Sequence, residues 1–205
     1  KGERPKTIAL HGDFTFQYPT DMDGDEVIFE KAGVELVNNH YSLTKKDWEL
    51  GQLFQLIAHK IKKNRFVYVF RLDGEENVKL HWPRTELNIK TKDVKKQKFG
   101  YTESPLVAYK NTKIIIPSEK TALQKQTEGD DYLFVLYSYD VIDDIDRVME
   151  TIQNSSLPME KRLEEALGDD LIPYDQVEFA KNKISAKTKA SNGTVLGVMI
   201  ESKGE

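Results

Sequence analysis

The stretch from Arg65 to Trp82 has the clearest alternation of hydrophobic positions in the chain. Its first half alternates aromatic residues with valines, in the order Phe66, Val67, Tyr68, Val69 and Phe70. A period of two, built from aromatic and β-branched residues, is typical of a β-strand. Because Asp73-Gly74 interrupts the run before a second short one, the pattern predicts a β-hairpin. Hydrophobic residues on both faces predict that its first strand is covered on both sides.

Other segments also predict strands. Between Thr7 and Tyr18 the aromatic residues fall on one face, and Pro19 is expected to end the strand. Apolar runs predict further strands at Ala32–Val37, Pro105–Tyr109, Lys113–Pro117 and Tyr132–Tyr139. The tail from Val177 to Ser202 predicts a closing hairpin with Asn192-Gly193 at its turn.

The segment from Leu43 to Lys63 fits two periods. Its apolar residues can lie on one face of a helix at a spacing of 3.6, and they also fit a strand with two apolar faces. Periodicity alone does not decide between the two in so short a run. We predict a strand over Leu53–Lys60, on the strength of a family resemblance described below.

The hydrophobic period changes from two to 3.6 after Tyr139. The apolar stripe that follows consists of Ile142, Ile145, Val148, Met149 and Ile152. It predicts a helix that ends near Asn154. A second helix is expected to start at Pro158, which suits a first helical position, and to end at Gly168. The sequence therefore predicts a mainly β fold with two helices inserted at about residues 141–168.

Composition limits the classes of protein that this chain can represent. It has 205 residues, 39% of them hydrophobic, and a net charge of −4, so we expect a folded domain and no nucleic-acid partner. The absence of cysteine excludes disulfides, thiolate zinc sites and cysteine nucleophiles in this chain. No apolar run reaches about 18 residues, so we expect no transmembrane segment. The chain starts at Lys1, which we interpret as a processed or truncated product.

No motif in the sequence specifies a reaction or a cofactor. The acidic run from Asp21 to Glu26 resembles a calcium loop, but its glycine is the fourth residue and its twelfth position is Ala32, so the spacing fails. The four histidines are scattered without metal-binding spacing, at His11, His40, His59 and His81. Nucleophile-elbow, P-loop and dinucleotide-binding motifs do not occur, so we expect no catalytic residue, cofactor or metal. Paired carboxylates that meet only in space stay open.

A lysine-rich segment from Leu87 to Tyr101 predicts an exposed loop. Cations and aromatic residues mix there and could contact an acidic polymer or a polysaccharide. The candidate contact residues are Trp82, Arg84, Lys95, Lys96, Lys98, Phe99 and Tyr101. The competing interpretation is that the lysines keep the loop soluble and protect strand edges. Trp48 and Trp82 likewise are either sugar-stacking platforms or core residues.

From about Tyr41 onward, the order of elements resembles a bacterial family of domains of unknown function. That family occurs alone in envelope proteins and appended to caspase-like peptidases, kinases and repeat modules. The segments that carry the resemblance are GQLFQLIAHK (51–60), FVYVFRLDGEENVKLHWP (66–83), IIIPSEK (114–120), YLFVLYS (132–138), DVIDDIDRVMETI (140–152) and VLGVMIES (195–202).

The resemblance implies an immunoglobulin-like or related β-sandwich with the helices packed at one end. It places the sandwich domain at residues 41–205 and leaves 1–40 as a strand-containing extension packed on it. It supplies no catalytic residues to carry over. We therefore expect a non-catalytic binding or scaffolding domain of the bacterial cell envelope, periplasmic or surface-exposed, with a protein or glycan partner and a lipid anchor outside this chain. The alternatives are an accessory module of a larger signalling or peptidase protein, a cytoplasmic location, and a carbohydrate-active hydrolase.

Overall fold

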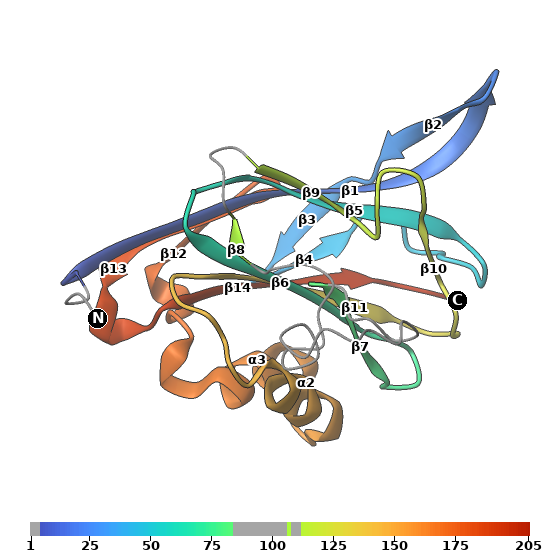
Figure 1. The fold of residues 1–205 in the computed structure, drawn as a ribbon. Helices are drawn as coiled ribbons and strands as arrows, with labels where there is room; N and C mark the ends of the chain where they lie inside the picture. The colour runs from blue at the N-terminus through green and yellow to red at the C-terminus, as the bar shows by residue number, and fades with distance from the viewer. Residues whose placement is uncertain (1–4, 84–105, 108–111) are drawn as a thin grey trace, which may run out of the picture.

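The computed structural model describes residues 5–83, 106–107 and 112–205, and these form three layers. Two β-sheets pack face to face, and two helices cover the outer face of the second sheet (Figure 1). The mainly β sandwich with two inserted helices that the sequence predicts is confirmed.

The first sheet is antiparallel. In spatial order, its main strands are β10 (Leu123–Gln124), β5 (Leu53–Ile61), β1 (Thr7–Asp23), β13 (Lys183–Lys189) and β12 (Val177–Ala180). Two further strands pair outside this path, β2 (Glu26–Lys31) with β1 and β9 (Thr112–Ile116) with β5. β1 belongs to the segment 1–40 that the sequence assigns to an extension, and it lies between β5 and β13. The core residues Leu10, Phe14 and Phe16 come from this strand.

The second sheet lies between the first sheet and the helices (Figure 1). Its strands are, in order, β3 (Val34–Val37), β4 (His40–Leu43), β14 (Val195–Ser202), β11 (Asp131–Ser138), β6 (Arg65–Leu72) and β7 (Val78–Trp82), with β8 (Leu106–Val107) paired to β6. The β4–β14 pair is parallel. The covering helices are α2 (Ile145–Asn154) and α3 (Met159–Leu167). Short 3₁₀ turns follow at Gly168–Asp170, Tyr174–Gln176 and Ala190–Asn192.

Strand β6 shows how the sequence builds the layers. Val67 and Val69 point into the core between the sheets, whereas Tyr68 and Phe70 point into a second core beneath the helices. All four side chains are buried, so the prediction of a strand covered on both faces is confirmed. The turn from Asp73 also forms as predicted, because β6 and β7 pair as an antiparallel hairpin.

Most of the other predicted strands are present. The ambiguous segment forms strand β5, as the resemblance suggests, and β11 is central in its sheet, between β14 and β6. The apolar run KIIIP forms β9. Of the strand predicted at Pro105–Tyr109, only β8 falls within the described residues.

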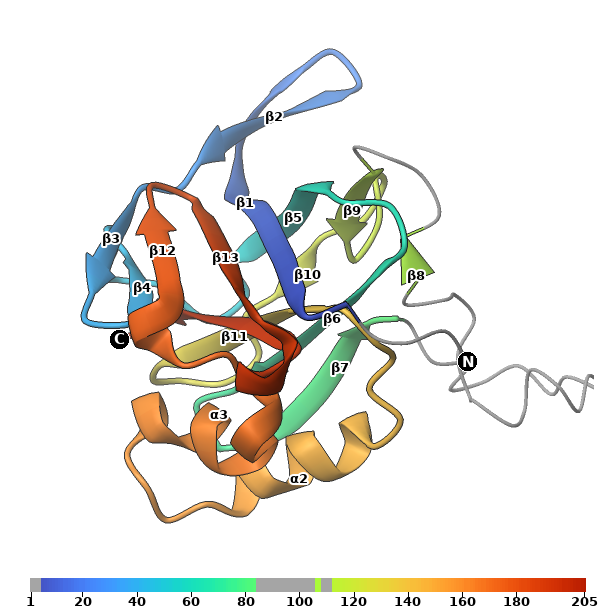
Figure 2. The same cartoon turned by 90° about the vertical axis from the view of Figure 1, so that its left-hand side faces the viewer.

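The prediction that Pro19 ends the first strand is wrong. β1 continues to Asp23 and pairs with β2, and the register shifts between Pro19 and Asp21. Proline removes one ladder hydrogen bond, and an irregularity of pairing accommodates that loss without ending the strand. The resulting β1–β2 arm projects away from the rest of the molecule (Figure 2).

The predicted closing hairpin is also wrong. β13 pairs with β1 and β12 in the first sheet, whereas β14 pairs with β11 and β4 in the second. The chain crosses between sheets at Ala190–Gly193, where Gly193 has a φ of 131°. The tight turn of this region lies instead between β12 and β13, where Asn182 adopts a φ of 58°. An Asn-Gly pair indicates a sharp turn, but it does not specify which sheet each arm joins.

The helices form where the sequence predicts them. Ile145, Val148 and Ile152 of α2 are buried, and Pro158 immediately precedes α3, which starts at Met159. The expectation that the helices pack at one end of the sandwich is wrong, because they cover a face of the second sheet (Figure 1). The residues Phe70, Phe134 and Leu136 on that face are apolar, so the sheet needs a cover of this kind.

Candidate functional site

Only Trp82 of the predicted contact residues lies in the described part of the chain. Its half-buried side chain packs against the core between the sheets, and its buried indole Nε1 has no hydrogen-bond partner among the described residues. The other predicted contacts, Arg84, Lys95, Lys96, Lys98, Phe99 and Tyr101, lie outside the described residues. Trp48 is 1% exposed and belongs to the core, which agrees with its interpretation as a structural residue.

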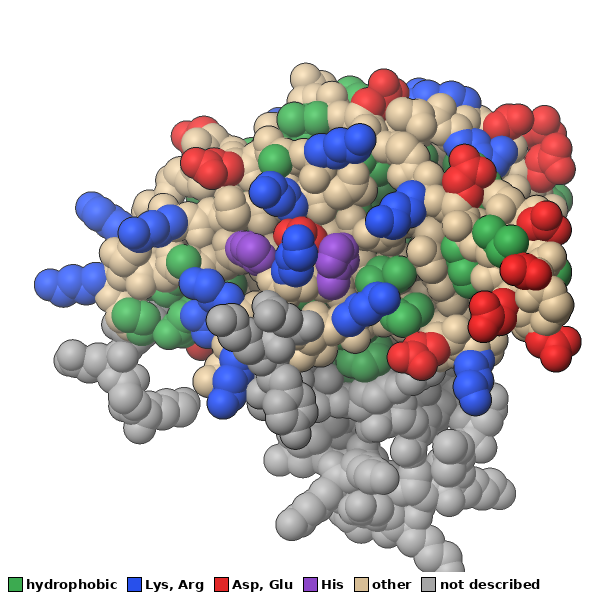
Figure 3. Space-filling view, turned by 90° about the horizontal axis from the view of Figure 1, so that it is seen from above, with side chains coloured by type: hydrophobic (Ala, Val, Ile, Leu, Met, Phe, Trp, Pro, Cys, Tyr) green, Lys and Arg blue, Asp and Glu red, His purple; other side chains and the backbone are tan. Residues whose placement is uncertain are grey.

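Two of the four histidines, His11 and His59, lie on the outer face of the first sheet. Figure 3 shows this face, on which histidines flank a lysine and an acidic side chain. Asp13 lies opposite His59 in the sheet, 3.9 Å from His11 Nε2 and 3.5 Å from Lys60 Nζ. The carboxylate therefore already has a cationic partner in the chain itself. Nowhere in residues 5–83, 106–107 and 112–205 do three or more His, Asp or Glu side chains gather in a way that could hold a metal ion.

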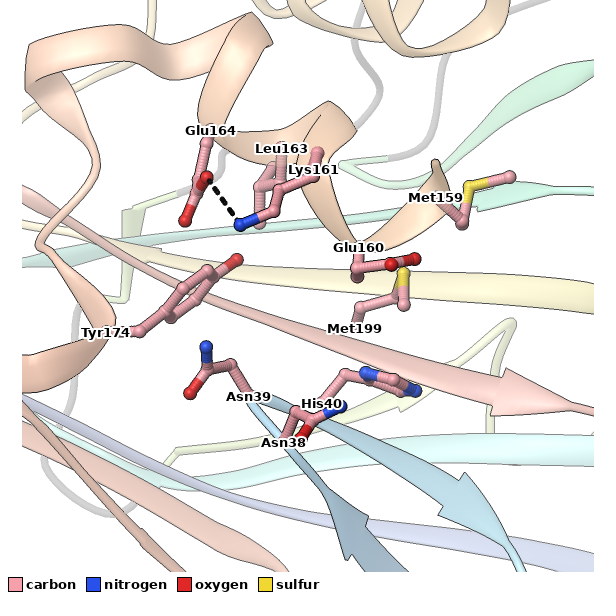
Figure 4. Close-up of a pocket in the computed structure, with 10 residues that line it drawn as sticks. All are labelled: Asn38, Asn39, His40, Met159, Glu160, Lys161, Leu163, Glu164, Tyr174 and Met199. Carbon is pink, nitrogen blue, oxygen red and sulfur yellow. Dashed lines mark ion pairs between the residues drawn. The ribbon is translucent and has the colours of Figure 1, made fainter. Parts of the chain in front are cut away.

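A pocket of about 310 Å³ opens beside α3, on the helix-covered face of the second sheet (Figure 4). Its walls come from the β3–β4 turn and the start of β4, from α3 and the 3₁₀ turn at Tyr174–Gln176, and from β14. The lining residues are Asn38, Asn39, His40, Met159, Glu160, Lys161, Leu163, Glu164, Tyr174 and Met199. This volume is at the lower end of the range for small-molecule sites.

Close packing of α3 on β14 forms the floor of the pocket. Leu163 and Met199 are 2% and 4% exposed, and both belong to the core beneath the helices. A β-carbon on Gly197 would lie 2.6 Å from Leu163 Cδ2, so only glycine at this position allows so close an approach. The floor is therefore apolar and held in place by the fold.

His40 stands at the start of β4 and is held by a carboxylate. Its Nε2 lies 3.4 Å from Glu201 Oε2 on the neighbouring strand, and both side chains are about 85% buried. Its Nδ1 is buried and has no hydrogen-bond partner among the described residues. Glu201 also lies opposite Tyr132, and burial together with the carboxylates of Glu201 and Asp130 raises the pKa of Tyr132 to about 12. One ring nitrogen of His40 thus lies beside a carboxylate, and the other is buried without a hydrogen-bond partner among the described residues.

The opposite side of the pocket carries a phenol and an ion pair. Tyr174 points its hydroxyl toward Glu164 and Lys161, whose charged atoms lie 3.9 Å apart (Figure 4). Burial and the carboxylate of Glu164 raise the pKa of Tyr174, so this side chain stays a neutral phenol. Hydroxyl, ammonium and carboxylate groups here can orient a ligand whose remainder lies on the apolar floor.

Two asparagines close the pocket at the β3–β4 turn. Val37 pairs with His40, so the turn consists of Asn38 and Asn39 alone. Asn38 adopts a φ of 55°, a conformation that asparagine tolerates better than most residues. The short turn places two amide groups and the adjacent imidazole at the mouth of one cavity.

Sequence reasoning missed this pocket. It considered His40 only as one of four scattered histidines and did not single out Met159 or Met199. The available signal was the Asn-Asn-His sequence at a predicted strand boundary, together with a methionine at the start of a predicted helix. Neither signal shows that α3 and β14 meet beside that turn.

No family model matches the chain, and no significant match to a curated protein or to a solved structure is found. The described residues contain no helix that is both long and apolar enough to span a membrane. The fold and the site therefore define this chain as a β-sandwich domain with a helix-covered face and a small pocket beside α3.

Proposed function

We propose that this chain is a non-catalytic binding domain of the bacterial cell envelope, and that it holds a small ligand in the pocket beside α3. The observation that carries the proposal is the pocket itself. It combines an apolar floor with a rim of polar and charged side chains from several elements, and such groups can orient a bound ligand. The immobilised imidazole of His40 and the neutral phenol of Tyr174 face the same cavity and are suited to orienting a ligand.

The envelope location and the non-catalytic role rest on the sequence resemblance. The strand order that motivates it, from Gly51 to Ser202, includes β14, which also contributes Met199 to the pocket. The finer relation to immunoglobulin-like sandwiches and an anchor outside this chain belong to the same proposal. A protein or glycan contact at Arg84 to Tyr101 stays a prediction.

A bulky residue in the β3–β4 turn provides a direct test. Asn39 is exposed and lines the pocket, so Asn39→Trp should fill the cavity without disturbing the core. Glu75→Trp, in the exposed β6–β7 turn, is the matched control. After incubation with a bacterial envelope extract and buffer exchange, native mass spectrometry should show an added mass on wild type and Glu75→Trp but not on Asn39→Trp.

Two results would count against this function. Equal loading of Asn39→Trp and wild type would place the ligand elsewhere on the molecule. Recovery of the native protein only in the cytosolic fraction of the cells that encode it would remove the envelope from the proposal.

One observation supports a second candidate, a carbohydrate-active hydrolase. Glu160 and Glu164 both line the pocket from α3, and glycosidases use a pair of carboxylates. This candidate requires activity on a panel of polysaccharides that Glu160→Gln or Glu164→Gln abolishes while the fold is retained. Activity that survives both substitutions, or no activity at all, would eliminate it.

A further inference from the structure

The pocket beside α3 brings together the softest donor atoms that the chain possesses. The chain has no cysteine and four methionines, and two of these, Met159 and Met199, line this cavity together with His40. In Figure 4 both thioethers and the imidazole lie on the same side of the pocket, away from Tyr174. Thioether sulfur and imidazole nitrogen form a ligand set that suits monovalent copper.

Strand register places His40 and Met199 next to each other. Tyr41 pairs with Ile200 and Ser42 with Glu201 in the parallel β4–β14 pair, so the preceding residues, His40 and Met199, are neighbours across the same pair. Tyr41 and Ile200 point into the core between the sheets, and alternation turns the preceding residues toward α3. Neighbouring strands lie about 4.8 Å apart, which allows two such side chains to bind one ion.

The imidazole is already arranged as a metal ligand would be. Metal-binding histidines usually hold one ring nitrogen against a carboxylate and direct the other to the metal. In His40, Nε2 lies 3.4 Å from Glu201 Oε2, and Nδ1 is buried without a hydrogen-bond partner among the described residues. A buried nitrogen without a partner costs free energy, and a bound metal ion would remove that cost.

Met159 supplies a third donor from above. It is the first residue of α3, it is partly buried, and it packs against the core beneath the helices. Its long unbranched side chain can turn its sulfur toward the pair below. Two neutral thioethers with one imidazole favour a soft monovalent ion over Zn²⁺, which prefers thiolate, imidazole or carboxylate ligands.

We propose that the pocket beside α3 binds one Cu⁺ ion through His40 Nδ1 and the sulfur atoms of Met159 and Met199, with Glu201 positioning the imidazole. The proposal rests on the proposed function, because it names the class of ligand for the same pocket. Ag⁺, which has the same preference for soft donors, should bind at the same three atoms.

The test is an anaerobic titration of the purified chain with Cu⁺ in competition with a chromogenic Cu⁺ chelator. Wild type should bind one equivalent, and Met159→Leu/Met199→Leu should lower the affinity by about 100-fold or more. His40→Gln should lower the affinity for Cu⁺ as well.

The matched controls are Met22→Leu/Met149→Leu and His11→Gln. They make the same substitutions at residues outside the pocket, and both should bind Cu⁺ as wild type does. Methionine to leucine nearly conserves volume, and circular dichroism checks that each variant is folded.

Wild type that fails to compete for Cu⁺, or a pocket double variant that binds as tightly as wild type, would overturn the metal site. Preferential binding of Zn²⁺ would overturn it too. These failures are distinguishable from failure of the binding function. If wild type takes up a ligand from the envelope extract and Asn39→Trp does not, the pocket still binds an organic ligand even when it binds no Cu⁺.

Discussion

Buried tyrosines connect the two sheets through single hydroxyl groups. Tyr137, in the second sheet, reaches across the core and donates a hydrogen bond to the backbone oxygen of Asp13 at 3.3 Å. Tyr41 donates to the backbone oxygens of Ala180 and Lys183 in the first sheet. Each of these hydroxyls is buried and hydrogen-bonded, so it contributes to the relative position of the sheets instead of costing free energy.

Gly12 makes room for the ring of Tyr137. A β-carbon at this position would lie 2.2 Å from Cζ of Tyr137, whose side chain is fully buried. We predict that Gly12→Ala lowers the free energy of unfolding by about 1–3 kcal/mol, as overpacking does. Urea denaturation measures this loss. In the double variant Gly12→Ala/Tyr137→Leu the two costs should be clearly less than additive, and strict additivity would show that the two residues do not interact.

His81 makes stability depend on pH. Burial, together with the positive charges of Arg71 and Lys79, lowers its pKa from 6.5 to about 3. Between these values the unfolded chain binds a proton that the folded chain does not. The stability that neutral His81 contributes to the folded state is therefore fully present above pH 6.5. It is lost as pH falls toward 3, by about 1.4 kcal/mol of unfolding free energy per pH unit.

His81→Leu should remove this dependence. We predict that urea unfolding of the variant loses less stability than wild type between pH 6.5 and 4, because its buried side chain has no proton to exclude. His11→Gln, at a position where the side chain is 42% exposed, should keep the wild-type slope. Identical slopes for His81→Leu and wild type would contradict the assignment.

At the scale of elements, α3 serves two purposes. It covers the apolar face of β14, and it provides one wall of the pocket. Leu163 is the contact that combines them, since it is buried against Gly197 and lines the cavity. We predict that Leu163→Ala lowers the free energy of unfolding by about 2–5 kcal/mol and weakens ligand binding.

The control for Leu163→Ala is Glu150→Ala, at an exposed position of the neighbouring helix α2. It should change the free energy of unfolding by less than about 0.5 kcal/mol. Thermal unfolding of wild type, Leu163→Ala and Glu150→Ala, with and without one equivalent of Cu⁺, separates the loss of stability from the loss of binding. A Leu163→Ala variant as stable as wild type would mean that α3 is not docked on the sheet as described.

The β1–β2 arm contributes little to the core. Val27 and Ile28 are 45% and 43% exposed, and the arm projects from the sandwich (Figure 2). We predict that Val27→Ser and Ile28→Ser each change the free energy of unfolding by less than about 0.5 kcal/mol. Phe16→Ala, at a buried position of β1 within the sandwich, should cost about 3–5 kcal/mol. A large loss in the arm variants would show that the arm is buried in solution by self-association.

At the scale of the whole molecule, local patterns predicted most of the elements and the β6–β7 hairpin, but not the other strand pairings. Alternation along β6 and the stripe of α2 could be recognised because each reflects burial of one element by itself. The separation of β13 and β14 into different sheets could not be recognised, because each segment by itself has the pattern of a strand and the Asn-Gly pair between them suits a hairpin equally well. Pairing is a non-local property, which a single strand's pattern does not encode.

The candidate site could not be predicted for the same reason. Its donors come from a turn near residue 40, the start of α3 and the middle of β14, and only the completed second sheet with its helices brings them together. His40 and Met199 are neighbours solely through the parallel β4–β14 pair. A sequence pattern within either strand alone does not predict that pairing.

The most direct test of the binding pocket is a methyl NMR spectrum of the chain labelled with ¹³C at its four methionine methyl groups. Met159 and Met199 line the pocket, whereas Met22 lies on the arm and Met149 on α2. Addition of one equivalent of Cu⁺ should shift the signals of Met159 and Met199 and leave the other two unchanged. Shifts confined to Met22 or Met149, or four unchanged signals, would contradict the account.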